Sequence, residues 1–503
     1  MMKLNRSEVA KHTTINNCWV IINENVYDVT EFLKKHPGGA KIILAHAGRD
    51  ATKAFESFHQ AEIIDQNLGP DKNLGTVTQD VSSTGEADSV IESPRSKPKL
   101  SSIISLSDFE HAASKSLPGS SFAFLKSGAE DEYASNWNRD SWKTLRFRPR
   151  VLRPIESVDI SSTLLGTKLS APFFICPAGG AKLANTKGDL CLVKAAARHG
   201  ILHWVCNNSA ISQQDMANAR APDQTLYWQI YAMTDLEVTE KQIKEAVRLG
   251  YKGFALTVDA IRAGKRERDL RMATVDTEED EDDDLEVEEN FSKEPSVQRP
   301  PVWSSFDWKS SIEWLRKMTS LPIAIKGIQC WEDALLCMEY GVHPWLSNHG
   351  GRQLDSAPSA MDTLLSIRKN CPEVFDRCEV IVDGGVTRGS DVVKALALGA
   401  KGVGLGRPFL YSLVFGEAGA SKAIRILKHE IETTMALLGV TSLDQLNPSY
   451  SITFSKKAPR LSSHASPNLQ PVKFAPNLTI HAPLPGQGHG PGILIIRSIL
   501  SPN

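Results

Sequence analysis

The sequence lacks the features that mark membrane-spanning, secreted and nucleic-acid-binding proteins. None of its apolar runs approaches the roughly 18 residues that a membrane-spanning helix requires. The net charge is only −2, so no general affinity for nucleic acid or an anionic membrane is expected. The 8 cysteines form no C-x-x-C pair, which is typical of reduced, buried thiols inside cells. No cleavable presequence is visible at the amino terminus, which favours a cytoplasmic location.

Length and local composition predict several units. A chain of 503 residues with 41% apolar and 23% charged residues has room for two or three folded domains. We expect a small α+β domain over residues 1–77 and a flexible linker over residues 78–102, which are rich in Ser, Thr, Glu and Pro. A large α/β domain should follow over residues 103–456. The proline-rich tail, residues 457–503, is interpreted as disordered or atypical.

One stretch of nine residues, Ser347–Asp355, carries most of the chemistry. His349 can take a proton near neutral pH, because imidazole titrates there when unperturbed. Arg352 offers a planar set of donors that matches a carboxylate in two-point contact. Gly350 and Gly351 let the backbone approach a ligand closely. Together these residues predict a site that binds an acid and removes a proton from it.

Short apolar runs alternate with helical segments through the large domain, which predicts a (β/α)8 barrel. The eight expected strands are Ala171–Pro177, Ile201–Cys206, Leu226–Tyr231, Gly253–Val258, Pro322–Gly327, Val342–Ser347, Glu379–Gly384 and Lys401–Gly406. In this fold the active site lies at the carboxyl ends of the strands.

Polar side chains and glycines gather at those ends. The strand-end polar residues are Gln229, Tyr231, Thr257, Asp259 and Lys326. Glycine-rich loops follow strands seven and eight, with charge from two arginines; they comprise Asp383, Gly384, Gly385, Arg388, Gly406 and Arg407. Loops at these two strands commonly hold a phosphate through backbone N–H groups. We therefore predict one phosphate site, and FMN rather than FAD or NAD, because no G-x-G-x-x-G motif opens a helix after an early strand.

These motifs together resemble the FMN-dependent α-hydroxy-acid dehydrogenases and oxidases. The resemblance implies that His349 is the base, that Asp259 orients it, and that Arg352 binds the substrate carboxylate with help from Arg266. Tyr231 would donate to the substrate hydroxyl or to the oxyanion that develops from it. The resemblance also implies flavin contacts from Lys326, Gln229, Thr257, Pro177, Ala178, Gly179 and Cys206.

The amino-terminal unit contains a histidine in a Pro-Gly-Gly turn, His36, and a second histidine, His59, amid apolar residues. An iron porphyrin needs two axial donors and apolar walls. Together with Trp19-Val20-Ile21 and Tyr27–Phe32, the two histidines resemble cytochrome b5, which implies that they ligate haem b. His46 is the competing ligand, and we interpret it as structural.

The two resemblances together imply a dehydrogenase of the L-lactate dehydrogenase (cytochrome) type. Such an enzyme oxidises an L-2-hydroxy acid and passes electrons through FMN and haem to a one-electron acceptor such as cytochrome c. The family also suggests a homotetramer, and the mitochondrial intermembrane space as an alternative location. Two other readings stay open: an oxidase that uses oxygen, and a drifted paralogue that binds both cofactors without catalysis.

The chain departs from the family pattern at several places. Phe124 stands where the family has a tyrosine that binds the substrate carboxylate. Gly179 and Asn208 leave more room for the substrate side chain, so a substrate bulkier than lactate is expected. The sixth strand is one residue shorter than usual and contains Pro344, which cannot donate a hydrogen bond in a central strand and raises the question of a register slip.

Overall fold

The computed structural model describes residues 3–36, 40–59, 62–77, 98–275 and 305–453. Several predicted features lie outside the described residues: the Pro37-Gly38-Gly39 turn, most of the linker (78–97), an acidic run predicted to be a solvated loop (276–289), and the tail (457–503). Within the described part of the chain, no helix combines the length and apolar character needed to cross a membrane.

The amino-terminal unit is a small α+β domain built on one mixed sheet. Its strands lie in the order β1 (Lys3–Leu4), β5 (Asn73–Val77), β4 (Asn25–Asp28), β3 (Asn17–Ile22) and β2 (Thr13–Thr14). Its helices are α1 (Arg6–Val9), α2 (Ala40–Leu44), α3 (Thr52–Phe58) and α4 (Glu62–Asn67). Because side chains alternate along β3, Val20 packs in one core cluster and Ile21 in another on the opposite face.

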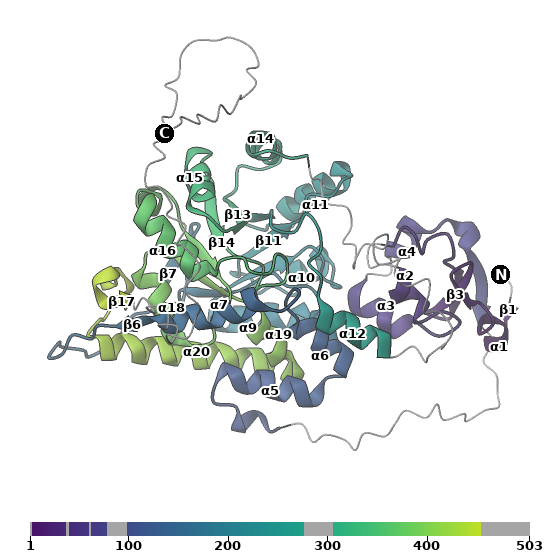
Figure 1. Ribbon diagram of the computed structural model, residues 1–503, viewed down its shortest axis with the longest axis horizontal. Helices are drawn as coiled ribbons and strands as arrows, with labels where there is room; N and C mark the ends of the chain where they lie inside the picture. Colours follow the sequence, from purple (N-terminus) through teal and green to yellow (C-terminus); the bar gives the residue numbers. More distant parts are fainter. Residues whose placement is uncertain (1–2, 37–39, 60–61, 78–97, 276–304, 454–503) are drawn as a thin grey trace, which may run out of the picture. The chain divides into compact units, whose positions relative to one another are not determined.

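The large domain is a closed barrel of parallel strands, as the sequence predicts (Figure 1). In chain order the strands are β9 (Phe173–Ile175), β10 (Leu202–Cys206), β11 (Leu226–Ile230), β12 (Phe254–Thr257), β13 (Ile323–Ile328), β14 (His343–Leu346), β15 (Ile381–Asp383) and β16 (Gly402–Leu405), and β16 closes on β9. Seven of these lie within the expected runs, and β13 runs one residue past its own. The (β/α)8 prediction is confirmed.

Helices surround the barrel. They are α5 (Leu106–Ser116), α6 (Gly119–Lys126), α7 (Tyr133–Thr144), α8 (Ala181–Ala184), α9 (Asp189–His199), α10 (Gln213–Asn218), α11 (Leu236–Arg248), α12 (Glu267–Val275), α14 (Trp308–Met318), α15 (Trp331–Glu339), α16 (Ala360–Asn370), α17 (Val374–Arg377), α18 (Gly389–Ala397), α19 (Arg407–Ser412) and α20 (Gly416–Leu438). Short ladders pair β6 (Leu145–Phe147) with β17 (Ser451–Thr453), and β7 (Ser162–Leu164) with β8 (Thr167–Leu169). Local signals set several helix starts: Ser359 and Asp362 form a capping box at α16, a device that contributes about 1 kcal/mol.

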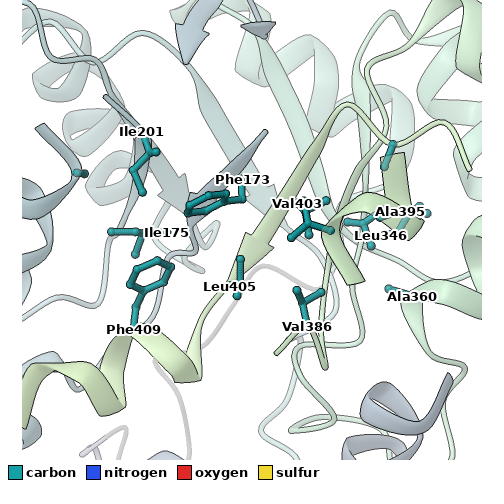
Figure 2. Packing of buried hydrophobic residues seen from close by; sticks show 14 of the residues in the cluster. Phe173, Ile175, Ile201, Leu346, Ala360, Val386, Ala395, Val403, Leu405 and Phe409 are labelled. Atoms are coloured by element: carbon teal, nitrogen blue, oxygen red, sulfur yellow. The ribbon is translucent and has the colours of Figure 1, made fainter. Parts of the chain in front are cut away.

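Strand alternation separates two cores. Phe173 and Ile175 of β9 point outward and pack near Phe409 of α19 and Leu405 of β16 (Figure 2). Between them, Phe174 points into the barrel, where it belongs to the inner cluster. Aromatic side chains fill this interior: Trp204 and Trp345 are fully buried, with ring centroids 4.9 Å apart. The barrel is therefore a packed core, and ligands must bind at its ends.

The short sixth strand, β14, pairs with β13 along its whole length, with one irregularity in the ladder. In β14, Pro344 pairs with Ile325 and Trp345 pairs with Lys326, and the ladder then shifts at Gly327. Gly327 has a φ of +116°, and a Cβ there would lie 2.7 Å from the Cβ of Asp259, so only glycine fits this irregularity. The irregularity thus lies in β13, and Leu346 at the end of β14 pairs with Ile328, just beyond it.

Candidate active site and haem site

The base predicted at His349 is held by a buried carboxylate. Nδ1 of His349 lies 2.8 Å from Oδ1 of Asp259, whose side chain is only 1% exposed. A carboxylate only accepts, so the imidazole carries its proton on Nδ1 and presents Nε2 as the acceptor. Nε2 lies 3.4 Å from the hydroxyl oxygen of Tyr231. The geometry gives a proton acceptor whose charged form is stabilised from behind.

The nine-residue stretch places this histidine at some conformational cost. His349 has a φ of +57°, and Gly350 and Gly351 follow at +68° and +74°, so three successive residues are left-handed. A Cβ on Gly351 would collide with the backbone of Ser135. The loop holds this shape because Asn348 exchanges two hydrogen bonds with Asn138, at 2.7 and 3.0 Å.

The end of the same stretch fixes neighbouring segments. Gln353 donates to the carbonyl oxygens of Asp259 and Arg262, at 3.1 and 2.9 Å. Asp355 accepts from the backbone N–H groups of Tyr133 and Ala134 at the start of α7. The loop therefore holds the segment that carries Asp259, and the acid–base pair is preorganised.

Two arginines converge on Phe124. The guanidinium carbons of Arg266 and Arg352 lie 5.1 and 5.3 Å from the centroid of its ring. Arg352 donates through Nη1 to the backbone oxygens of Phe124 and Ser127, which fixes its orientation. Nη2 of Arg266 lies 3.7 Å from Oδ2 of Asp269. The arrangement presents two cations on the wall of the cavity that also contains His349 and Tyr231.

A second charged pair, Lys326 and Asp383, lies on the wall of the same cavity. Nζ of Lys326 donates to Oγ of Ser347 at 3.1 Å and lies 3.8 Å from Oδ2 of Asp383. Burial acts to lower the pKa of Lys326, but the charges of Asp383 and Asp259 outweigh it and raise that pKa above its usual value. Lys326 is therefore a permanent cation at neutral pH.

The structure also shows which side chains donate hydrogen bonds to Asp383, and the sequence had not indicated them. Oδ1 accepts from Ser347 at 2.7 Å and Oδ2 accepts from Nε1 of Trp345 at 2.9 Å. Ser347 lies in the recognised stretch, but Trp345 lies inside a strand, where a tryptophan reads as core. No pattern in one sequence separates a packing tryptophan from one that donates to a charged group.

Most of the residues predicted to contact the flavin line the cavity at the carboxyl ends of the strands. They are Pro177, Ala178, Gly179, Cys206, Lys326, Asp383, Gly384, Gly385, Gly406 and Arg407. Gln229 and Thr257 lie just beneath and bond to each other at 2.9 Å. Arg388 is not brought to this place: it pairs at 2.9 Å with Glu430 on α20, while Thr387 lines the cavity instead.

Two buried polar atoms fit a flavin mononucleotide. Oε1 of Gln229 has no hydrogen-bond partner within the described ranges, and it could accept from a ring N–H. Nε of Arg407 is likewise buried without a partner in the described part, beside the glycine loops predicted to hold a phosphate. Nη2 of Arg407 donates to the backbone oxygens of Ser127 and Gly350 at 3.1 and 2.9 Å, and Nη1 donates to Oγ of Ser135 at 3.1 Å.

The amino-terminal unit brings its two predicted iron ligands together. The ring centroids of His36 and His59 lie 5.9 Å apart, close to the roughly 6 Å that two imidazoles need on opposite sides of one metal ion. Phe32 and Phe55 pack beside them. Burial, with a smaller effect of His36, lowers the pKa of His59 to about 4, so its ring is neutral and able to bind a metal at pH 7.

Comparison with known proteins identifies the families of both domains. The profile of the FMN-dependent dehydrogenases matches residues 113–453, and that of the cytochrome b5-like haem/steroid-binding domain matches residues 5–84. The chain belongs to the FMN-dependent dehydrogenase family. It is 40% identical over 452 residues to an L-lactate dehydrogenase (cytochrome) of Wickerhamomyces anomalus, covering 88% of this chain and 78% of that one. With that of Saccharomyces cerevisiae it shares 37% identity over 476 residues, 89% and 79% of the two chains.

Solved structures with similar folds come from the same family of enzymes. A flavocytochrome b2 variant with pyruvate bound matches with a TM-score of 0.66 and 34% identity, over 75% of this chain and 96% of that one. A soluble variant of the (S)-mandelate dehydrogenase of Pseudomonas putida matches with a TM-score of 0.62 and 33% identity, over 70% and 100%. The protein is thus an FMN-dependent dehydrogenase with a cytochrome b5-like domain, and the predicted cofactors, FMN and haem, are confirmed. The individual site residues stay predictions.

Proposed function

We propose that the barrel oxidises an L-2-hydroxy acid to the 2-oxo acid and that the electrons leave through the haem domain to a one-electron acceptor. The observation that carries this proposal is the 2.8 Å pair of His349 and Asp259 on the same cavity as two arginines. A 2-hydroxy acid needs a cation for its carboxylate and a base beside its hydroxyl. Arg352 provides the cation and His349 the base, and both belong to the stretch Ser347–Asp355.

In the proposed mechanism each residue has one task. Arg352, with Arg266 beside it, binds the carboxylate and turns C2 and its hydroxyl toward His349. The Tyr231 hydroxyl bonds to the substrate oxygen. Nε2 of His349 takes a proton from the substrate, and the imidazolium that results is stabilised by Asp259. Oxidation to the 2-oxo acid removes two protons and two electrons from the substrate; His349 takes one proton, and the electron pair with the second proton would pass to the bound FMN.

The cofactors supply the electron chemistry, since FMN accepts an electron pair and haem passes electrons singly. Lys326 would stand at the flavin edge, where its charge favours the reduced, anionic ring. Arg407 and the backbone of Gly385 and Gly406 would hold the phosphate. The acceptor beyond the haem is proposed to be cytochrome c.

A substrate with a larger side chain than lactate is proposed from two features of the cavity. Phe124 offers no hydroxyl to the carboxylate, and loss of a hydrogen bond to a charged group costs roughly 1.5–3 kcal/mol. Gly179 lines the cavity, and a Cβ there would lie 3.3 Å from the backbone oxygen of Asn208. Gly179→Ala should therefore raise KM for bulky 2-hydroxy acids selectively and leave lactate little affected.

Visible spectra of the full-length protein test the proposal. Under anaerobic conditions, a panel of 2-hydroxy acids from glycolate and lactate to mandelate should bleach the flavin and then reduce the haem. Flavin bleaching without haem reduction, combined with rapid oxygen consumption in air, would point instead to an oxidase. No bleaching with any acid would point to a cofactor-binding protein without this activity.

The proposed homotetramer and the mitochondrial alternative for the location rest on family resemblance. We propose a homotetramer, measurable by light scattering. We propose a cytoplasmic location, with the mitochondrial intermembrane space as the alternative, and fractionation separates the two.

A further inference from the structure

We propose that Trp345 sets the reduction potential of the flavin by holding Asp383 out of direct contact with Lys326. The proposal rests on the placement of Lys326 beside the flavin in the proposed function. Trp345 is not among the residues that line the cavity, and it acts through Asp383 and Lys326, so it is a positioning residue.

The carboxylate of Asp383 is held by donors on both of its oxygens. Nε1 of Trp345 donates to Oδ2 at 2.9 Å, and Oγ of Ser347 donates to Oδ1 at 2.7 Å. The thiol of Cys176 lies 3.8 Å from Oδ2, and burial keeps the pKa of this thiol well above its usual value, so it remains protonated. These contacts satisfy the carboxylate without the help of Lys326.

The ammonium group is consequently near Asp383 but not bonded to it. The separation of 3.8 Å between Nζ and Oδ2 exceeds hydrogen-bond distance, and Nζ donates to Ser347 instead. An ammonium in direct contact with a carboxylate would be largely neutralised toward a third group. Held apart, Lys326 keeps more of its charge directed at the cavity, where it stabilises a reduced, anionic flavin.

Removing the indole donor should let the ammonium of Lys326 move into direct contact with the carboxylate of Asp383. Without the bond from Trp345, the buried carboxylate of Asp383 is short of one donor. The ammonium of Lys326 and the thiol of Cys176 both lie 3.8 Å from Oδ2, and the charged ammonium is the stronger donor of the two. A phenylalanine at this position keeps an aromatic ring under Lys326, whose Nζ lies 5.8 Å from the Trp345 ring centroid. Trp345→Phe therefore removes the hydrogen bond while retaining most of the packing.

The chain offers a matched control in Trp204. Its ring packs against Trp345 with centroids 4.9 Å apart, it is equally buried, and its Nε1 has no partner among the described residues. Trp204→Phe removes the same atoms from the same core without removing a hydrogen bond. Any effect of lost volume should appear in both variants.

The test is a spectroelectrochemical titration of the full-length protein, with the haem of the same sample as internal reference. Trp345→Phe should lower the flavin midpoint potential by about 30 mV, which corresponds to a tenfold change in the equilibrium constant of a two-electron couple. Trp204→Phe should leave both potentials unchanged. Equal shifts in the two variants, no shift in Trp345→Phe, or a shift to higher potential would overturn the proposal.

A third variant separates this proposal from the one on which it rests. Lys326→Met should lower the flavin potential more than Trp345→Phe does. If Lys326→Met has no effect, the placement of Lys326 beside the flavin is wrong. If Lys326→Met lowers the potential and Trp345→Phe does not, that placement stands and the role given to Trp345 is wrong.

Discussion

Replacing Asp259 by asparagine tests the catalytic assignment most directly. Asparagine has nearly the same shape, so the cavity should be preserved. The carboxylate lies 2.8 Å from Nδ1 of His349 and is almost fully buried, so its charge is poorly screened by solvent. Asp259→Asn removes that charge just where the imidazolium forms.

The size of the effect follows from the bond that is lost. A hydrogen bond to a charged group contributes roughly 1.5–3 kcal/mol, and the imidazolium that benefits exists only once the proton has moved. We therefore expect Asp259→Asn to slow flavin reduction roughly ten- to 150-fold, with little change in substrate affinity.

Anaerobic stopped-flow absorbance at saturating 2-hydroxy acid measures this rate directly, and FMN and haem content measured on the same samples controls for folding. His349→Gln should nearly abolish reduction while FMN stays bound. Because Asp259 assists proton transfer through its bond to His349, the double variant should be little slower than His349→Gln alone. Reduction at the wild-type rate in Asp259→Asn, or additive effects in the double variant, would refute the reasoning.

Three further predictions concern other parts of the molecule. His59→Ala should abolish the sharp reduced-state absorption bands of low-spin haem, whereas His46→Ala should keep them; the reverse result would contradict the ligand assignment. Phe124→Tyr should lower KM for all 2-hydroxy acids in steady-state assays by restoring a donor to the carboxylate, and an unchanged KM would count against that position. Burial raises the pKa of Asp189 to about 6, so its contribution to stability is full below about pH 4 and is lost as pH rises through 6. Asp189→Asn should therefore increase the free energy of unfolding at pH 7–8, by at most about 3 kcal/mol, and leave it little changed at pH 4; chemical unfolding at both values decides.

The sequence by itself determined the architecture and most of the site. Short apolar runs separated by helical segments specify a parallel barrel, because strands buried on both faces must be apolar along their whole length. The carboxyl ends of such strands meet at one end of the barrel. The polar residues at those ends must therefore lie close together; they are Gln229, Thr257, Asp259 and Lys326. The nine-residue stretch was recognisable because nearly every residue in it has a defined task. His349 and Arg352 are required by the chemistry, and Asn348, Gln353 and Asp355 are required by the hydrogen bonds that hold the loop.

Other features were decided only in the tertiary structure. Arg388 and Thr387 are adjacent in sequence, and which of them faces the cavity depends on Glu430, which lies on a distant helix and draws the arginine away. The ladder opposite the short sixth strand is irregular at Gly327 in the neighbouring strand, where a side chain would meet Asp259. Trp345 reads as core from its strand, yet the one polar atom of its side chain meets Asp383 on the neighbouring strand β15. A sequence displays which residues can donate and accept, but partners far apart in the chain meet only when packing has placed their elements, and at these positions packing made the choice.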